Sequence, residues 1–184
     1  DSTISCVSTG NGELLWQVKS NAPVFSSALV KGRKVYIGNG DGQVHALNLR
    51  NGKKKWIFSQ GSGYIETKPV LAQGKLIYGA WDESVYALNT RNGQLEWQWS
   101  GGRSGLLYSP AACWPVVADN KVFVVAPDRV MTAINISNGE TIWRKSGYRV
   151  RESIGISEDG MHVFARTMQD SVISAITAVD SFAL

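Results

Sequence analysis

Histidine and cysteine, the side chains that most often supply nucleophiles and metal ligands, are scarce in this sequence of 184 residues. It contains only His45, His162, Cys6 and Cys113. None of them lies in a motif that brings a nucleophile or several metal ligands together. Two cysteines do not make a disulfide framework, and the residues alone leave open whether Cys6 and Cys113 pair. We therefore expect no catalytic residue and no metal site in this chain.

Long apolar runs are also missing. No run is long enough to cross a bilayer, so we expect no transmembrane segment, and the residues contain no targeting segment. The net charge is a mild +4, from 19 basic and 15 acidic residues. The basic tract Lys53–Lys55 follows a turn, and we interpret it as a solvated strand edge. Nucleic-acid binding needs a broader basic face, so no nucleic-acid partner is expected.

No helical periodicity competes with a repeat that dominates the sequence. Four segments share a small residue, an apolar residue, Asn or Ser, two variable residues, Asn-Gly, three variable residues and Trp: CVSTGNGELLW, ALNLRNGKKKW, ALNTRNGQLEW and AINISNGETIW. A fifth copy starts at Ala175 and lacks both Asn-Gly and Trp. The small residues at positions 6, 46, 87, 133 and 175 are 40, 41, 46 and 42 residues apart, a period typical of propeller blades or helical solenoids.

The content between the motifs favours propeller blades. Short runs rich in β-branched and aromatic residues, such as 75–79 and 84–88, are divided by turns that contain Gly and Asn. Each repeat therefore predicts one antiparallel four-stranded sheet, so the expected fold is an all-β propeller. We expect one domain over 1–184, or part of a larger one, with about four blades' worth of chain: a partial unit at 1–18, complete units at 22–59, 65–100 and 109–145, and a partial unit at 152–178.

The tryptophans of the repeat are expected to hold neighbouring blades together. A blade cannot bury its faces alone, and an indole brings roughly 150–250 Å² of surface to bury. Truncating such a residue usually costs about 3–5 kcal/mol. The small residue of each motif leaves room where two sheets approach. The predicted docking residues are Trp16, Trp56, Trp97 and Trp143.

This pattern resembles the tryptophan-docking motif of quinoprotein-like (PQQ-repeat) β-propellers, over almost the whole chain. WD-repeats fit less well, because the one Trp-Asp pair, Trp81-Asp82, lies in a predicted turn rather than at the end of a blade. The resemblance implies a ring of seven or eight blades, which needs more chain than is present. Three ways of closing the ring stay open: a segment of a larger propeller, a propeller completed by a second chain, or a four-bladed ring.

The resemblance also allows a check for enzyme activity. Quinone-dependent dehydrogenases of this family hold the quinone beneath a disulfide between adjacent cysteines, next to a calcium ion bound by Glu, Asn and Asp. This sequence has no Cys-Cys pair, and its short loops carry no such acidic group. We therefore expect no enzyme, no cofactor and no cofactor-binding residue.

A non-catalytic binding or scaffold module is the function that the resemblance favours. It would be similar in kind to the outer-membrane assembly lipoproteins of Gram-negative bacteria, and periplasmic or extracellular. Two alternatives remain: a sensor or substrate-recruiting domain of a larger protein with a kinase or phosphoesterase domain, and a fragment of a quinone dehydrogenase.

One face of the predicted propeller carries the candidate site for a protein partner. In an antiparallel meander, the loops between second and third strands and those between blades emerge on the same face. Arg, Tyr and Trp there are the residue types enriched at binding hot spots, and arginines could receive carboxylates. The alternative is that they only pack and solubilise the loops. The candidates are Trp81, Asp82, Arg103, Tyr108, Arg129, Arg149 and Arg151.

Overall fold

A series of antiparallel sheets forms the whole of the described structure. The computed structural model describes residues 2–101, 110, 113–125, 128–167 and 173–177. A short first sheet pairs β1 (Thr3–Val7) with β2 (Leu14–Lys19). The second sheet contains β3 (Leu29–Lys31), β4 (Lys34–Gly38), β5 (Val44–Asn48) and β6 (Lys54–Phe58), and the third contains β7 (Val70–Ala72), β8 (Lys75–Gly79), β9 (Ser84–Asn89) and β10 (Leu95–Ser100). The fourth contains β11 (Val116–Ala118), β12 (Lys121–Val124), β13 (Val130–Asn135), β14 (Thr141–Ile156), β15 (His162–Thr167) and β16 (Ile173–Thr177).

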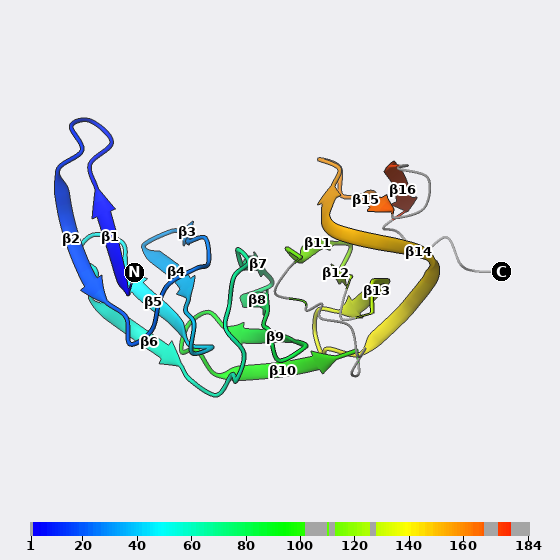
Figure 1. Ribbon diagram of the computed structural model, residues 1–184, viewed down its shortest axis with the longest axis horizontal. Helices are drawn as coiled ribbons and strands as arrows, with labels where there is room; N and C mark the ends of the chain where they lie inside the picture. The colour runs from blue at the N-terminus through cyan, green and yellow to red at the C-terminus, as the bar shows by residue number, and fades with distance from the viewer. Residues whose placement is uncertain (1, 102–109, 111–112, 126–127, 168–172, 178–184) are drawn as a thin grey trace.

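The sheets follow one another along an open arc (Figure 1). In the two four-stranded sheets, the first strand lies on the concave side and the last strand on the convex side. Within each sheet, every strand pairs with its neighbour in sequence, as in a meander. The predicted all-β fold of four-stranded, propeller-type blades is confirmed, and the arc is that of a partial ring. No helix among the described residues could cross a membrane.

The repeat motif occupies the same register in each sheet. The small residue lies directly opposite the tryptophan in the pairs Cys6–Trp16, Ala46–Trp56, Ala87–Trp97 and Ala133–Trp143. A register shift next to each pair gives the last strand a bulge, which increases its local twist. The three alanines are fully buried. A small side chain opposite the indole thus lets neighbouring sheets approach closely.

Three tryptophans contact the Asn-Gly turn of the next sheet along the arc. Nε1 donates to a main-chain carbonyl three residues after the small residue of that sheet, in the pairs Trp16–Leu49 at 2.9 Å, Trp56–Thr90 at 3.2 Å and Trp97–Ile136 at 2.9 Å. The ring lies on the turn glycine, where an added Cβ would approach ring atoms to 2.7 Å at Gly52, 2.5 Å at Gly93 and 2.9 Å at Gly139. Glycine is required there for the flat contact, and also for its positive φ.

The core of the described residues is divided into four clusters: three lie between successive sheets, and one lies within the fourth sheet, between β11–β13 and the pair formed by the end of β14 and β15. Alternate residues of a strand point to opposite neighbours. In β4, for example, Tyr36 packs toward the third sheet, whereas Val35 and Ile37 pack toward the first. The second and third sheets bury Trp56 and Phe58 against Leu76 and other residues between them. The first three sheets have no core of their own, so their stability depends on the stacking of successive sheets.

The connection after Trp143 differs from the expected one. The units predicted at 109–145 and 152–178 imply a break between them, but β14 runs without interruption from Thr141 to Ile156. It pairs first with β13 and then with β15, which fuses the two units into one six-stranded sheet. The segment 144–156 contains no Pro and no Asn-Gly, so nothing in its sequence requires a turn.

Candidate functional site

The predicted binding face is described only in part. Trp81 and Asp82 lie in the loop between β8 and β9, and Arg129 directly precedes β13. The main chain at Arg149 and Arg151 belongs to β14, and Val130 pairs with Arg149. The structure thus brings the main chain at 129 and 149 to adjacent strands. Arg103 and Tyr108 lie outside the described residues.

Three aromatic side chains in contact form a row that the sequence analysis did not predict. Trp81 is its inner end and Phe25 is its outer end. The Trp81 ring stacks on Tyr64, with centroids 5.1 Å apart and planes 19° apart, and Tyr64 meets Phe25 edge to face at 6.3 Å. Phe25 is 58% exposed and Tyr64 is 39% exposed. We call Phe25, Tyr64 and Trp81 the aromatic row. Exposed aromatic side chains in contact with one another are typical of binding surfaces.

Two inter-sheet loops position this row. Phe25 lies in the loop between β2 and β3, and Tyr64 in the loop between β6 and β7. The main-chain N–H of Trp81 donates to the Tyr64 carbonyl at 3.1 Å. A Cβ on Gly63 would lie 2.1 Å from the Asp82 nitrogen, so only glycine allows this close approach. The sequence signal was a single aromatic residue in each of two loops that contain several Ser residues.

Asp82 fixes the loop beneath the row. Its Oδ2 accepts hydrogen bonds from Tyr86 Oη at 2.5 Å and Ser62 Oγ at 3.0 Å. Burial, together with the hydrogen bond to Asp82, raises the pKa of Tyr86, so Tyr86 stays a proton donor. Asp82 therefore ties the β8–β9 loop to the preceding inter-sheet loop, and its role here is to hold the main chain.

Carboxylates border the outer end of the row. A cavity of about 340 Å³ lies among the β2–β3, β4–β5 and β6–β7 loops. It is lined by Pro23, Phe25, Gly40, Asp41, Tyr64 and Glu66. Glu66 Oε2 accepts a hydrogen bond from Trp81 Nε1 at 3.0 Å, which orients one carboxylate along the aromatic row. Asp41 and Glu66 are both exposed. This end of the loop face is therefore aromatic and acidic.

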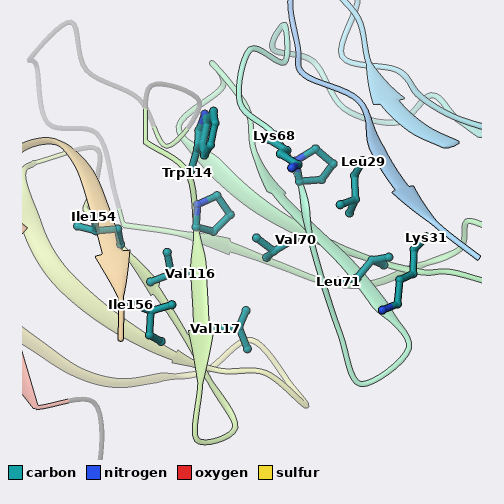
Figure 2. Close-up of a pocket in the computed structure, with 12 residues that line it drawn as sticks. Leu29, Lys31, Lys68, Val70, Leu71, Trp114, Val116, Val117, Ile154 and Ile156 are labelled. Atoms are coloured by element: carbon teal, nitrogen blue, oxygen red, sulfur yellow. The ribbon is translucent and has the colours of Figure 1, made fainter. Parts of the chain in front are cut away.

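A second, larger cavity lies among the innermost strands. It has a volume of about 500 Å³ and is lined from β3, β7, β11 and the end of β14, as Figure 2 shows. Its wall is mostly aliphatic, including Leu29, Val70 and Ile154, and Lys31 and Lys68 are its two charged residues. A quinone cofactor carries several carboxylates and needs several polar partners. The described lining does not fit such a cofactor well.

The histidines and cysteines are separate from both cavities. His45 is buried in β5, where burial and, to a smaller extent, Lys54 lower its pKa. His162 opens β15 and is exposed. Both cysteines are free, and burial raises the pKa of Cys113 to about 12. Among the described residues, no three His, Cys, Asp or Glu side chains are grouped as metal ligands would be.

Comparisons with known protein sequences give two kinds of relative. The family model described as outer membrane protein assembly factor BamB matches residues 1–114 and 99–180. Quinoprotein alcohol dehydrogenase PedE of Pseudomonas putida is 34% identical over 64 residues, which are 34% of this chain and 10% of that protein. A quinoprotein ethanol dehydrogenase of Pseudomonas aeruginosa is 34% identical over 56 residues, 30% of this chain and 9% of that protein. The chain thus spans about a tenth of the length of these dehydrogenases.

Solved structures share the fold at low sequence identity. BamB from Moraxella catarrhalis has a TM-score of 0.76 and 15% identity, over 96% of this chain and 52% of that chain. The computationally designed protein Ika4 has a TM-score of 0.75 and 15% identity, over 91% of this chain and 99% of that chain. The arc in Figure 1 thus spans about half of the BamB chain. At these identities the likeness establishes the fold alone.

Proposed function

The chain belongs to the PQQ-repeat family whose model is described as outer membrane protein assembly factor BamB, and from this premise we propose that it is a non-catalytic binding module for a protein partner. The aromatic row on the loop face is the observation that carries the proposal. Phe25 and Tyr64 keep much of their surface exposed although both lie in loops tied down by main-chain hydrogen bonds. A preformed, exposed aromatic surface binds a partner at a small cost in conformational entropy.

By analogy with BamB, an outer membrane protein assembly factor, the proposed partner is a component of outer-membrane protein assembly and the proposed location is the periplasm. The other residues of the predicted face remain candidate contacts: Arg103, Tyr108, Arg129, Arg149 and Arg151. Trp81 and Asp82 support the surface from within, since both have partners inside the chain.

Site-specific photo-cross-linking in a Gram-negative cell envelope tests this function. A benzoylphenylalanine placed at Phe25 or Tyr64 is expected to capture one outer-membrane assembly component, identified by mass spectrometry. Leu95, which at 39% is as exposed as Tyr64 and lies on β10, is the matched control position. Equal capture from Leu95, or no discrete product from either aromatic position, would overturn the proposal.

A quinone dehydrogenase fragment is the rival function, favoured by the identity to PedE over 64 residues. Titration with pyrroloquinoline quinone and calcium separates the two. The binding module is expected to show no saturable quinone binding and no reduction of a dye acceptor on addition of an alcohol. Saturable binding accompanied by dye reduction would establish the dehydrogenase instead.

A further inference from the structure

The cavity at the outer end of the aromatic row has a specific ligand chemistry. Its described lining contains two aromatic rings and two carboxylates, and no Lys or Arg is among these residues. Although the whole chain carries a net charge of +4, this cavity is locally acidic. Its volume of about 340 Å³ is near the lower end of the usual range for ligand pockets, which suits one long side chain.

The two carboxylates differ in how they are held. The indole N–H of Trp81 donates to Glu66 Oε2 at 3.0 Å and so fixes this carboxylate. The carboxylate oxygens can still accept hydrogen bonds from further donors. The main-chain N–H of Asp41 donates to Asn39 Oδ1 at 3.1 Å, and Asn39 is fully buried. The turn that carries Asp41 is therefore fixed, while its carboxylate is exposed at the cavity.

The aromatic rings provide the second half of the recognition. Phe25 and Tyr64 both line the cavity beside Asp41 and Glu66. A cation over an aromatic face is attracted by the electrons of the ring, and more strongly when the contact is desolvated. A guanidinium group combines planar stacking on a ring with forked donation to a carboxylate, which a neutral side chain cannot do.

We propose that this cavity binds an arginine side chain of the partner, stacked on Phe25 or Tyr64 and held by Glu66 and Asp41. The proposal deepens the binding function above and rests on it. It names the chemistry of the partner's contact: a basic segment in which one arginine inserts into the cavity among the β2–β3, β4–β5 and β6–β7 loops. The acidic end of the loop face selects that segment by charge.

Titration with a minimal probe tests the site without the partner. The probe is Nα-acetylarginine amide, and the neutral control ligand is Nα-acetylcitrulline amide, which has nearly the same shape. The readout is the NMR signal of the Trp81 indole N–H, assigned by its loss in Trp81→Phe. The arginine probe is expected to shift this signal saturably in the millimolar range and the citrulline probe is not, and added salt is expected to weaken the binding.

Matched variants locate the charge. Glu66→Gln keeps an oxygen acceptor for Trp81 and removes the charge, and Asp41→Asn does the same in the turn. Each is expected to weaken arginine binding about tenfold, the loss of one charge-assisted contact. Glu13→Gln removes an equal charge from the exposed β1–β2 hairpin and is expected to leave the affinity unchanged.

The outcomes separate this inference from the binding function. Equal binding of the two probes, unchanged affinity in both carboxamide variants, or no saturation would overturn the arginine site. Cross-linking at Phe25 and Tyr64 would still support the binding module in that case. Loss of discrete cross-linking together with saturable arginine binding would keep the cavity chemistry and refute the protein partner.

Discussion

One buried position of the repeat holds a different residue in each of three sheets. His45, Tyr86 and Thr132 occupy the position directly before the buried alanine in three successive sheets, and all three are buried. Tyr86 satisfies its hydroxyl with Asp82 at 2.5 Å, and Thr132 Oγ1 donates to the Val130 carbonyl at 3.1 Å. The Nε2 atom of His45 lies 3.5 Å from the Nδ2 atom of Asn39. The repeat therefore fixes burial at this position but not chemistry.

The buried histidine gives the fold a pH dependence. Because its pKa in the folded chain is below its ordinary 6.5, the unfolded chain takes up a proton first as the pH falls. The free energy of unfolding is therefore expected to be constant above about pH 7 and to decrease as the pH falls through 6.5 toward the lowered pKa. Urea unfolding between about pH 7.5 and about pH 5.5 measures this decrease, before most carboxylates titrate.

The variant His45→Tyr isolates the effect, because tyrosine occupies this position in the next sheet and does not titrate in the window. Its stability is expected to change less over the same pH range. His162→Gln, which alters the exposed histidine, is the control and should retain the decrease. A decrease of equal size in His45→Tyr would contradict the assignment.

At the scale of elements, loops of one sheet pack against the loop that leads to the next. The β4–β5 loop touches the β6–β7 loop so closely that a Cβ on Gly42 would lie 2.8 Å from the Gly63 carbonyl oxygen and 2.9 Å from that of Gly61. Gly42 also has a φ of 73°, and Glu83 and Arg129 adopt a φ of 65° at the equivalent position. The positive φ is therefore a property of this turn in all three sheets. The close contact with the β6–β7 loop is made at Gly42.

Two glycine variants separate these effects. Gly32→Ala, at a φ of 59° with open space around it, is expected to cost about 1–2 kcal/mol of unfolding free energy for the left-handed conformation alone. Gly42→Ala is expected to cost about 3 kcal/mol or more, because the two loops must also move apart. Chemical denaturation measures both, and equal losses would show that the loop contact contributes little.

At the scale of the whole molecule, the first sheet of the arc carries one glycine turn on which no described tryptophan docks. We call this turn at Gly12 the open receptor. The first sheet carries the same turn as the others, with a Gly12 φ of 75°, but nothing lies within 4 Å of a Cβ built there. Val7, Leu14 and Leu15 beside it are between 54% and 60% exposed. The described residues thus contain a turn shaped for an indole that no tryptophan ring among them covers.

This open receptor predicts self-association of the 184-residue chain. A second copy is expected to stack on β1 and β2 with a tryptophan over Gly12, because this contact buries the exposed apolar side chains beside the turn. Sedimentation velocity should show mass above 20.1 kDa as concentration rises.

Gly12→Ala is expected to weaken the association, whereas Gly74→Ala, with a φ of 74° and equally open surroundings, should not. A concentration-independent 20.1 kDa species, or association unchanged in Gly12→Ala, would contradict this contact.

The sequence by itself determined the propeller-type sheets, since their cause is local and periodic. Asn-Gly turns and alternating apolar residues recur every forty residues or so, and each repeat supplies the small residue and the tryptophan that lie opposite one another. The continuous β14 was not foreseen, because it depends on pairing with β13 and β15 at once rather than on a turn signal.

Only the tertiary structure decided the candidate site. The sequence predicts Trp81 and Asp82 as surface contacts, and in the structure both also have partners that hold the loop. Phe25 and Tyr64 are 39 positions apart and belong to different inter-sheet loops, so no motif links them. Their contact arises from the stacking of two sheets, which sets loops of successive repeats side by side. A repeat fixes each blade from within, whereas a surface that spans two blades exists only after they stack.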